Sequence, residues 1–161
     1  MTSWPQGIEV SIKNTADPHF RAQIHEAIKA FNDEISPAHK ATRSGDVDAL
    51  DIAVYDRDGC LLGGLIADTY WGWLDIEDFW LHEDYRLQGI GSQILQTAEK
   101  EARRRGCRRA KLETFSFQAR DFYEKQGYQV AGQLDDYPPG HSFFWMVKEL
   151  SAVSGQLSAG S

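Results

Sequence analysis

The sequence predicts a mixed α/β (α+β) fold with a mostly antiparallel sheet flanked by helices, and three observations support this prediction. Short segments of apolar residues have the length and pattern of strands. Three segments with apolar residues at helical spacing lie among them. Turn-forming residues at Asp56–Gly59 and Pro138–Gly140 each join two predicted strands, which indicates two antiparallel hairpins.

The first predicted elements are an edge strand and a helix. Residues Ile8–Asn14 alternate apolar and polar side chains, which favours a strand. Asp17 followed by Pro18 is typical of a helix start, and apolar residues at helical spacing predict a helix to about Ile35. The segment 36–47, which contains a proline and a glycine, predicts a loop or a short broken helix.

Three strands are predicted next, at Leu50–Tyr55, Cys60–Thr69 and Trp73–His82. Gly63 and Gly64 lie inside the second of them. A glycine pair within a strand indicates a bulge or close packing.

The C-terminal half alternates helices and strands before it ends in a hairpin. The predicted elements are a helix at Ser92–Arg105, a strand at Ala110–Phe115, a helix at Phe117–Gln126, and strands at Tyr128–Leu134 and Phe143–Leu150. The helix from Ser92 crosses over between two strands, so those two strands are expected to be parallel. Residues 1–150 are predicted to form one domain, because 161 residues suit a single compact unit, and the small polar residues 151–161 predict a flexible tail.

Composition excludes several classes of function. Lysine and arginine number 17 against 24 aspartate and glutamate residues, a net charge of −7. This balance argues against nucleic acid or an anionic membrane as partner, and it is compatible with a cationic ligand. The two cysteines are too few for a disulfide scaffold and form no close pair for zinc, so no metal is expected. With no signal peptide and no apolar run of about 18 residues, we expect a cytoplasmic protein.

One segment, Arg86–Ser92, points to a ligand. Its sequence is Arg-Leu-Gln-Gly-Ile-Gly-Ser, between a predicted strand and a predicted helix. Gly89 and Gly91 leave room for close approach to the backbone, and the free N–H groups of the helix start lie at the same place. The pattern indicates a phosphate site, to which Arg86 would add a charged contact, with a plain turn as the alternative. It is not a Walker A loop, because no Lys-Ser/Thr pair follows, and it lacks the third glycine of a dinucleotide-binding motif.

A second segment, Ala119–Tyr128, reads Ala-Arg-Asp-Phe-Tyr-Glu-Lys-Gln-Gly-Tyr. Together the two segments resemble the Gcn5-related N-acetyltransferase (GNAT) superfamily, over about residues 75–150. Its members bind the pyrophosphate of acetyl-CoA on an R/Q-x-x-G-x-G/A loop, and a later helix carries an A-x-x-F-Y-x-K-x-G-F/Y sequence. The resemblance implies a GNAT-like sheet with one parallel strand pair splayed around acetyl-CoA, which serves as co-substrate.

The resemblance also implies which residues contact acetyl-CoA. They are the loop residues Arg86, Leu87, Gln88, Gly89, Ile90, Gly91 and Ser92, the strand residues Phe79, Trp80 and Leu81, and Ser116 and Tyr123. The backbone of the strand residues would pair with the pantetheine arm. Tyr123 corresponds to the general acid of the family, with a role as a core tyrosine as its alternative. Ser116 departs from the asparagine that many members carry there.

Two carboxylates are candidates for the general base. Neutralising an alkyl ammonium acceptor at pH 7 costs about 4 to 5 kcal/mol, so a base must take its proton. Strand alternation places Asp75 and Glu77 on one face, roughly 6.6 Å apart, and Asp78 on the other face unless a bulge intervenes. Glu77 corresponds to the acid of spermidine/spermine N-acetyltransferases, and Asp75 to that of histone-type members. His82 and His141 are further candidates.

Four residues are expected to contact the acceptor: Asp78, Trp73, Tyr137 and His141, with ordinary packing or surface roles as their alternatives. The resemblance implies direct acetyl transfer to the primary amine of a small, cationic molecule, without a covalent enzyme intermediate. The alternatives are an antibiotic-resistance enzyme that modifies an aminoglycoside or nucleoside antibiotic, a protein N-acetyltransferase, and a non-catalytic acyl-CoA-binding module. By analogy with relatives, a homodimer is a further expectation.

Overall fold

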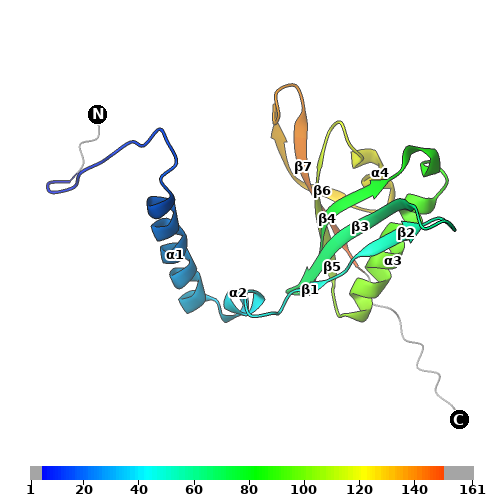
Figure 1. Ribbon diagram of the computed structural model, residues 1–161, viewed down its shortest axis with the longest axis horizontal. Coiled ribbons are helices and arrows are strands. Elements are labelled where there is room, and N and C mark those ends of the chain that lie inside the picture. The colour runs from blue at the N-terminus through cyan, green and yellow to red at the C-terminus, as the bar shows by residue number, and fades with distance from the viewer. Residues whose placement is uncertain (1–4, 151–161) are drawn as a thin grey trace, which may run out of the picture. The chain divides into compact units, whose positions relative to one another are not determined.

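The computed structural model describes residues 5–150 of the chain (Figure 1). The chain divides into two compact units, residues 1–44 and residues 45–161. The single domain expected over residues 1–150 stays a prediction. The tail expected at residues 151–161 lies outside the described residues.

The N-terminal unit contains helices α1 (Pro18–Ile35) and α2 (Pro37–Thr42). The Asp17 carboxylate accepts a hydrogen bond from the Phe20 N–H at 3.1 Å and caps α1, which confirms the predicted helix start. The strand predicted at Ile8–Asn14 is wrong, because this segment is irregular and exposed. Alternation alone does not make a strand, since the backbone groups of a strand need a neighbouring strand as partner.

The second unit is built on a seven-stranded sheet with the order β1-β3-β4-β5-β7-β6, in which β2 also pairs with β3. The strands are β1 (Asp48–Ala49), β2 (Ile52–Tyr55), β3 (Leu61–Tyr70), β4 (Trp73–Leu81), β5 (Arg109–Phe115), β6 (Gln129–Asp135) and β7 (Ser142–Glu149). All pairs are antiparallel except β4–β5, which is parallel. The predicted fold class, both hairpins and the parallel pair are confirmed.

Within residues 45–150, this unit also contains a 3₁₀ turn (Glu83–Tyr85) and the helices α3 (Ile90–Arg104) and α4 (Arg120–Lys125). Helix α3 lies against β3 and β4 (Figure 1) and buries its apolar stripe in the core. Helix α4 begins three residues later than predicted. The Gln118 side chain accepts a hydrogen bond from the Phe115 N–H at 2.9 Å and holds the preceding residues in a turn.

Close packing explains the glycine pair in β3. A Cβ on Gly64 would lie 2.4 Å from the carbonyl oxygen of Ile52, and one on Gly63 would lie 2.7 Å from the Leu81 side chain. Both glycines therefore allow the neighbouring strands to approach, which confirms the prediction of close packing.

The parallel strands separate soon after they meet. Pairing between β4 and β5 covers only Trp73–Ile76 and Arg109–Leu112. Immediately beyond, the register between β3 and β4 shifts so that Ile66 pairs with Asp78 while Ala67 pairs with Ile76. Glu77 is therefore the extra residue of a β-bulge, at the point where β4 leaves β5.

Candidate active site

The bulge changes which carboxylates share a face of β4. Asp75 pairs with Asp68 of β3, and Asp78 pairs with Ile66. Because Ile66 and Asp68 are two residues apart, Asp75 and Asp78 lie on the same sheet face. Regular alternation would have put Asp78 on the opposite face. Glu77 and Asp78 are both exposed.

The two candidate bases have different surroundings. Asp75 accepts a hydrogen bond from the Tyr70 hydroxyl at 2.5 Å and forms an ion pair with Lys111 at 2.5 Å, and its side chain is 17% exposed. Burial, followed by the contact with Asp75, raises the pKa of Tyr70. Within residues 5–150, Glu77 forms no hydrogen bond or ion pair through its side chain. The carboxylate of Glu77 is therefore exposed and unoccupied by the described residues, whereas that of Asp75 is held by Tyr70 and Lys111.

The candidate general acid, Tyr123, lies on α4 and is 7% exposed. Its ring contacts Phe79 of β4, Phe122 and Tyr128 at centroid distances of 6.5, 5.2 and 5.8 Å. Burial raises the pKa of Tyr123 to about 12, so the phenol keeps its proton at neutral pH. The position beside Phe79 puts the phenol close to the part of β4 that follows the bulge. A buried tyrosine that stays protonated suits a proton donor as well as a core residue.

The loop before α3 has the open geometry that an anion site requires. Gly89 has φ 80°, and a Cβ built on it would meet nothing within 4 Å. In the described part of the chain, the main-chain N–H groups of 87–92 have no hydrogen-bond acceptor. The Arg86 Nε donates to the carbonyl oxygen of Leu81 at 2.9 Å, which fixes this side chain beside the loop. These unpaired N–H groups include those of the first turn of α3, where the positive end of the helix dipole lies.

Contacts with α4 hold the start of α3 close to the candidate acid. A Cβ on Gly91 would lie 3.6 Å from the Phe122 ring and 3.8 Å from that of Phe79. The Ser92 hydroxyl accepts a hydrogen bond from the Gln126 side chain at 3.0 Å. The loop and Tyr123, which are predicted from separate motifs, are thus brought together around Phe79.

The remaining expected cofactor residues are distributed along β4 and β5. Trp80 is half exposed, and the edge of Phe79–Leu81 away from β3 pairs with no described strand, which leaves it available for an added strand. The hydroxyl of Ser116 accepts a hydrogen bond from the Ser142 N–H at 3.1 Å. Ser116 therefore ties the end of β5 to β7.

The expected acceptor residues do not all lie together. His141 contacts the Phe117 ring edge-on at 4.8 Å, and Tyr137 contacts Phe143 at 5.8 Å, so both belong to one end of the β5–β7 pair. Trp73 lies at the beginning of β4, where the guanidinium of Arg109 covers its ring at 5.4 Å. That contact gives Trp73 a packing partner four residues before the bulge.

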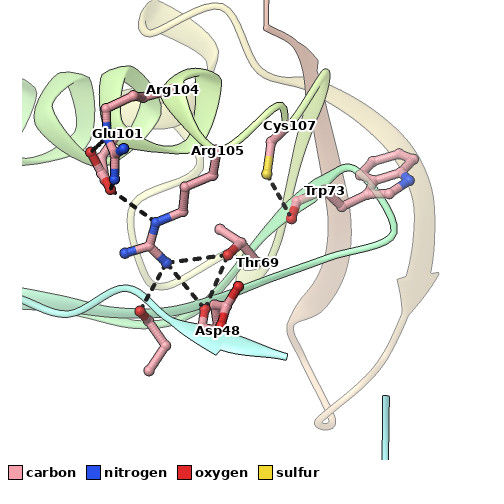
Figure 2. Close-up of polar contacts among 8 residues, drawn as sticks. Asp48, Thr69, Trp73, Glu101, Arg104, Arg105 and Cys107 are labelled. Atoms are coloured by element: carbon pink, nitrogen blue, oxygen red, sulfur yellow. Dashed lines mark hydrogen bonds and ion pairs between the residues drawn. The ribbon is translucent and has the colours of Figure 1, made fainter. Parts of the chain in front are cut away.

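The basic run at the end of α3 is occupied by structural contacts (Figure 2). Arg105 donates to the carbonyl oxygen of Ala49 at 2.9 Å and to the Thr69 hydroxyl at 3.2 Å, and its Nε donates to Glu101 at 2.9 Å. Hydrogen bonds from Arg104 and then Arg105 lower the pKa of Glu101 to about 2. Arg105 therefore binds α3 to β1 and β3, while Arg104 pairs with Glu101 within the helix.

Sequence reasoning missed a buried carboxylate, Glu99. It lies in the apolar stripe of α3, is 2% exposed, and pairs with Lys148 of β7 at 2.8 Å and with Arg103 at 3.3 Å. Burial and the charge of Glu99 raise the pKa of the neighbouring Tyr128. The signal was available, because an acid among apolar residues at helical spacing needs a buried partner.

The described residues contain neither a metal-binding group nor a membrane-spanning helix. Within residues 5–150, no group of three or more histidine, cysteine, aspartate or glutamate side chains is arranged to hold a metal ion. In the same part of the chain, no helix has the length and apolarity needed to cross a membrane.

Known proteins that are similar to this chain are acetyltransferases. Residues 17–128 match the Acetyltransferase (GNAT) family. The chain is 38% identical over 130 residues to a blasticidin-S acetyltransferase of Streptomyces morookaense, covering 76% of this chain and 96% of that protein. It is 36% identical over 125 residues to an acetyltransferase of Agrobacterium fabrum, covering 76% and 90% of the two chains. A crystal structure of an acetyltransferase from Bacillus cereus superposes with a TM-score of 0.72 at 30% identity, covering 87% of this chain and 98% of that one.

Proposed function

The chain belongs to the acetyltransferase (GNAT) family and is an N-acetyltransferase, and we propose that it transfers an acetyl group from acetyl-CoA to a primary amine of a nucleoside antibiotic. The observation that carries this proposal is the 38% identity to blasticidin-S acetyltransferase across 96% of that protein's length. Among the alternatives left open by the sequence, it favours an antibiotic amine over other small cationic amines.

The loop 87–92 supports acetyl-CoA as the donor. Its N–H groups have no acceptor in the described part of the chain, and Gly89 leaves the approach to them open. They would bind the pyrophosphate, and the free edge of Phe79–Leu81 would pair with the pantetheine arm. When bound, acetyl-CoA supplies the activated thioester next to the bulge of β4.

Glu77 and Tyr123 would move the protons. Glu77 accepts a proton from the ammonium group of the acceptor, directly or through water. The neutral amine nitrogen would then bond to the thioester carbonyl carbon, lose its second proton to water, and leave a neutral amide when the carbon–sulfur bond breaks. Tyr123 gives its proton to the departing sulfur, and a main-chain N–H near Trp80 stabilises the oxyanion that forms on the way.

A thiol-release assay with acetyl-CoA and a panel of amines tests this function. The panel contains blasticidin S, aminoglycosides, spermidine, amino acids and a peptide. We expect the highest kcat/KM with blasticidin S. Release with the peptide alone would assign a protein acetyltransferase instead. Saturable binding of acetyl-CoA without release on any amine would assign a non-catalytic binding module.

Replacement of Gly89 by alanine is expected to weaken acetyl-CoA binding by about 10-fold, or ~1.4 kcal/mol. An alanine at φ 80° is strained, so the loop backbone is expected to shift. The shift would change the orientation of the N–H groups that bind the pyrophosphate. Calorimetric titration of acetyl-CoA measures the change.

Gly59→Ala is the matched control, because Gly59 has φ 84° and also has nothing within 4 Å of its ideal Cβ. Both variants should lose about 1 kcal/mol of unfolding free energy from the same backbone strain. Only Gly89→Ala should lose affinity. An equal affinity in the two variants would remove the loop from the acetyl-CoA site.

A further inference from the structure

A continuous aromatic cluster occupies the end of β5 and β7 and the loop that precedes β7. Six rings are linked edge to face or face to face: Phe115, Phe117, Tyr137, His141, Phe143 and Trp145, with centroid distances of 4.8 to 5.8 Å. We call these six residues the aromatic platform. Within the platform, Phe143 is buried, whereas Phe117 and Tyr137 are each 55% exposed.

The platform is rigidly held from below. The Trp145 Nε1–H donates to the Glu113 carboxylate at 3.2 Å, which fixes the orientation of the indole. Gly132 of β6 lies directly against this ring, since a Cβ there would approach it to 3.0 Å. Phe115 and Phe117 are stacked with an interplanar angle of 7°. Rings fixed in this way bind a flat ligand at low entropic cost.

Two carboxylates border the platform. Glu113 accepts a hydrogen bond from Trp145 of the platform, and Asp136 directly precedes Tyr137 in the chain. Ionised carboxylates only accept hydrogen bonds, so the rim is complementary to a ligand that donates them.

The platform shares a sheet face with Asp75, one of the carboxylates of β4. Asp75 pairs with Lys111 of β5, and Glu113 lies two residues further along the same strand, opposite Trp145 of β7. Strand spacing and rise put Trp145 roughly 12 Å from Asp75, across two strands. An acceptor that reaches both the platform and the carboxylates of β4 must therefore be elongated.

We propose that the aromatic platform binds an amino-bearing planar nitrogen heterocycle of the acceptor, at the far end of the molecule from the amine that is acetylated. Nucleobases stack on phenylalanine, tyrosine, tryptophan and histidine rings, and each stacked base contributes about 1 to 3 kcal/mol. A carboxylate is the natural partner of an exocyclic amino group such as N4 of cytosine. The rim carboxylates disfavour a phosphate, so a nucleoside fits and a nucleotide does not. This inference rests on the proposed function and specifies how that function selects its substrate.

The first test measures binding without turnover. Cytidine is titrated into the full chain, and the indole Nε1–H resonance of Trp145 is followed by NMR, with uridine and methylguanidine as separate probes. We expect a saturable shift with cytidine and a weaker one with uridine, which lacks the amino group. Both Tyr137→Ala and Phe117→Ala should weaken the cytidine shift. Absence of a cytidine shift, or a response to methylguanidine alone, would overturn the proposal.

The second test uses the enzyme reaction. Tyr137→Ala should raise KM for blasticidin S by about 10-fold, the lower part of the range for a stacked base, with kcat changed less than about 2-fold. Tyr55→Ala on β2 is the matched control, because Tyr55 is 58% exposed and lies outside the platform. An unchanged KM in Tyr137→Ala with an active wild-type enzyme would overturn the platform and leave the proposed function standing. A cytidine shift in an enzyme that does not acetylate blasticidin S would support the platform and overturn the function.

Discussion

Replacement of Tyr123 by phenylalanine is expected to lower kcat by about 100-fold or more, the scale of general acid catalysis, while acetyl-CoA affinity changes little. The substitution removes only the phenolic oxygen. The ring contacts with Phe79, Phe122 and Tyr128 persist, so the fold around α4 should be retained. The hydroxyl is protonated at neutral pH because burial raises its pKa to about 12, which is the state that a proton donor needs.

Tyr128→Phe provides the control for this experiment. Tyr128 is the next ring in the same cluster, and its buried hydroxyl has no hydrogen-bond partner within residues 5–150. Tyr128→Phe therefore removes a buried hydroxyl group from the same cluster while the proposed proton donor, Tyr123, stays intact. Steady-state kinetics should show a large decrease in kcat for Tyr123→Phe and almost none for Tyr128→Phe. Similar kcat values for Tyr123→Phe and the wild type would remove Tyr123 from the chemistry.

The raised pKa of Tyr123 also has a consequence for stability at high pH. An unfolded tyrosine ionises near pH 10, whereas the folded one holds its proton to about pH 12. The contribution of this residue to stability is therefore complete below pH 10 and is lost as pH rises toward 12. The phenol should remain a competent acid across that lower range.

Replacement of Glu77 by glutamine is expected to lower kcat/KM by about 100-fold at pH 7 and by progressively less as the pH rises. An alkyl ammonium acceptor with a pKa near 10.4 loses its own proton in that range, so the missing base matters less. The exposed, unpaired setting of Glu77 at the bulge makes it the carboxylate available for this role. The ratio of mutant to wild-type kcat/KM, measured from pH 6.5 to 9.5, is the quantity to follow.

Two matched variants separate the candidate bases. Asp78→Asn changes an exposed neighbour on β4 that is expected to contact the acceptor, so any decrease in its ratio should be the same at every pH. Asp75→Asn weakens the contacts with Tyr70 and Lys111, so we expect an effect on stability and little dependence of the ratio on pH. A pH-dependent loss in Asp75→Asn together with a flat response in Glu77→Gln would transfer the role of base to Asp75.

Local chemistry made several elements predictable from the sequence. The Asp17–Pro18 pair specifies the start of α1 through residues of its first helical turn. The Asp56–Gly59 segment specifies a tight reverse turn, which brings the strands on either side together as an antiparallel pair. The glycine loop before α3 and the Phe122–Tyr123 motif were likewise visible as short patterns. Each of these features depends on residues that are close together in the chain.

The features that sequence reasoning missed depend on distant partners. The segment Ile8–Asn14 has the pattern of a strand but no partner strand, so its pattern misleads. A bulge before Asp78 was an open alternative, and only the pairing of β3 with β4 decides it, because a regular period of two cannot. Glu99 needs Lys148, which lies on β7 and comes 49 residues later in the chain. The aromatic platform likewise joins rings from β5, β7 and the loop between β6 and β7.

If the main-chain amides of residues 87–92 bind the pyrophosphate of acetyl-CoA, an NMR titration of the ¹⁵N-labelled chain with acetyl-CoA will show it residue by residue. We expect the amide resonances of Gln88, Gly89, Gly91 and Ser92 to show the largest saturable shifts, and those of the Gly59 turn to stay in place. Saturable binding that leaves the resonances of residues 87–92 unmoved would contradict this role of the loop.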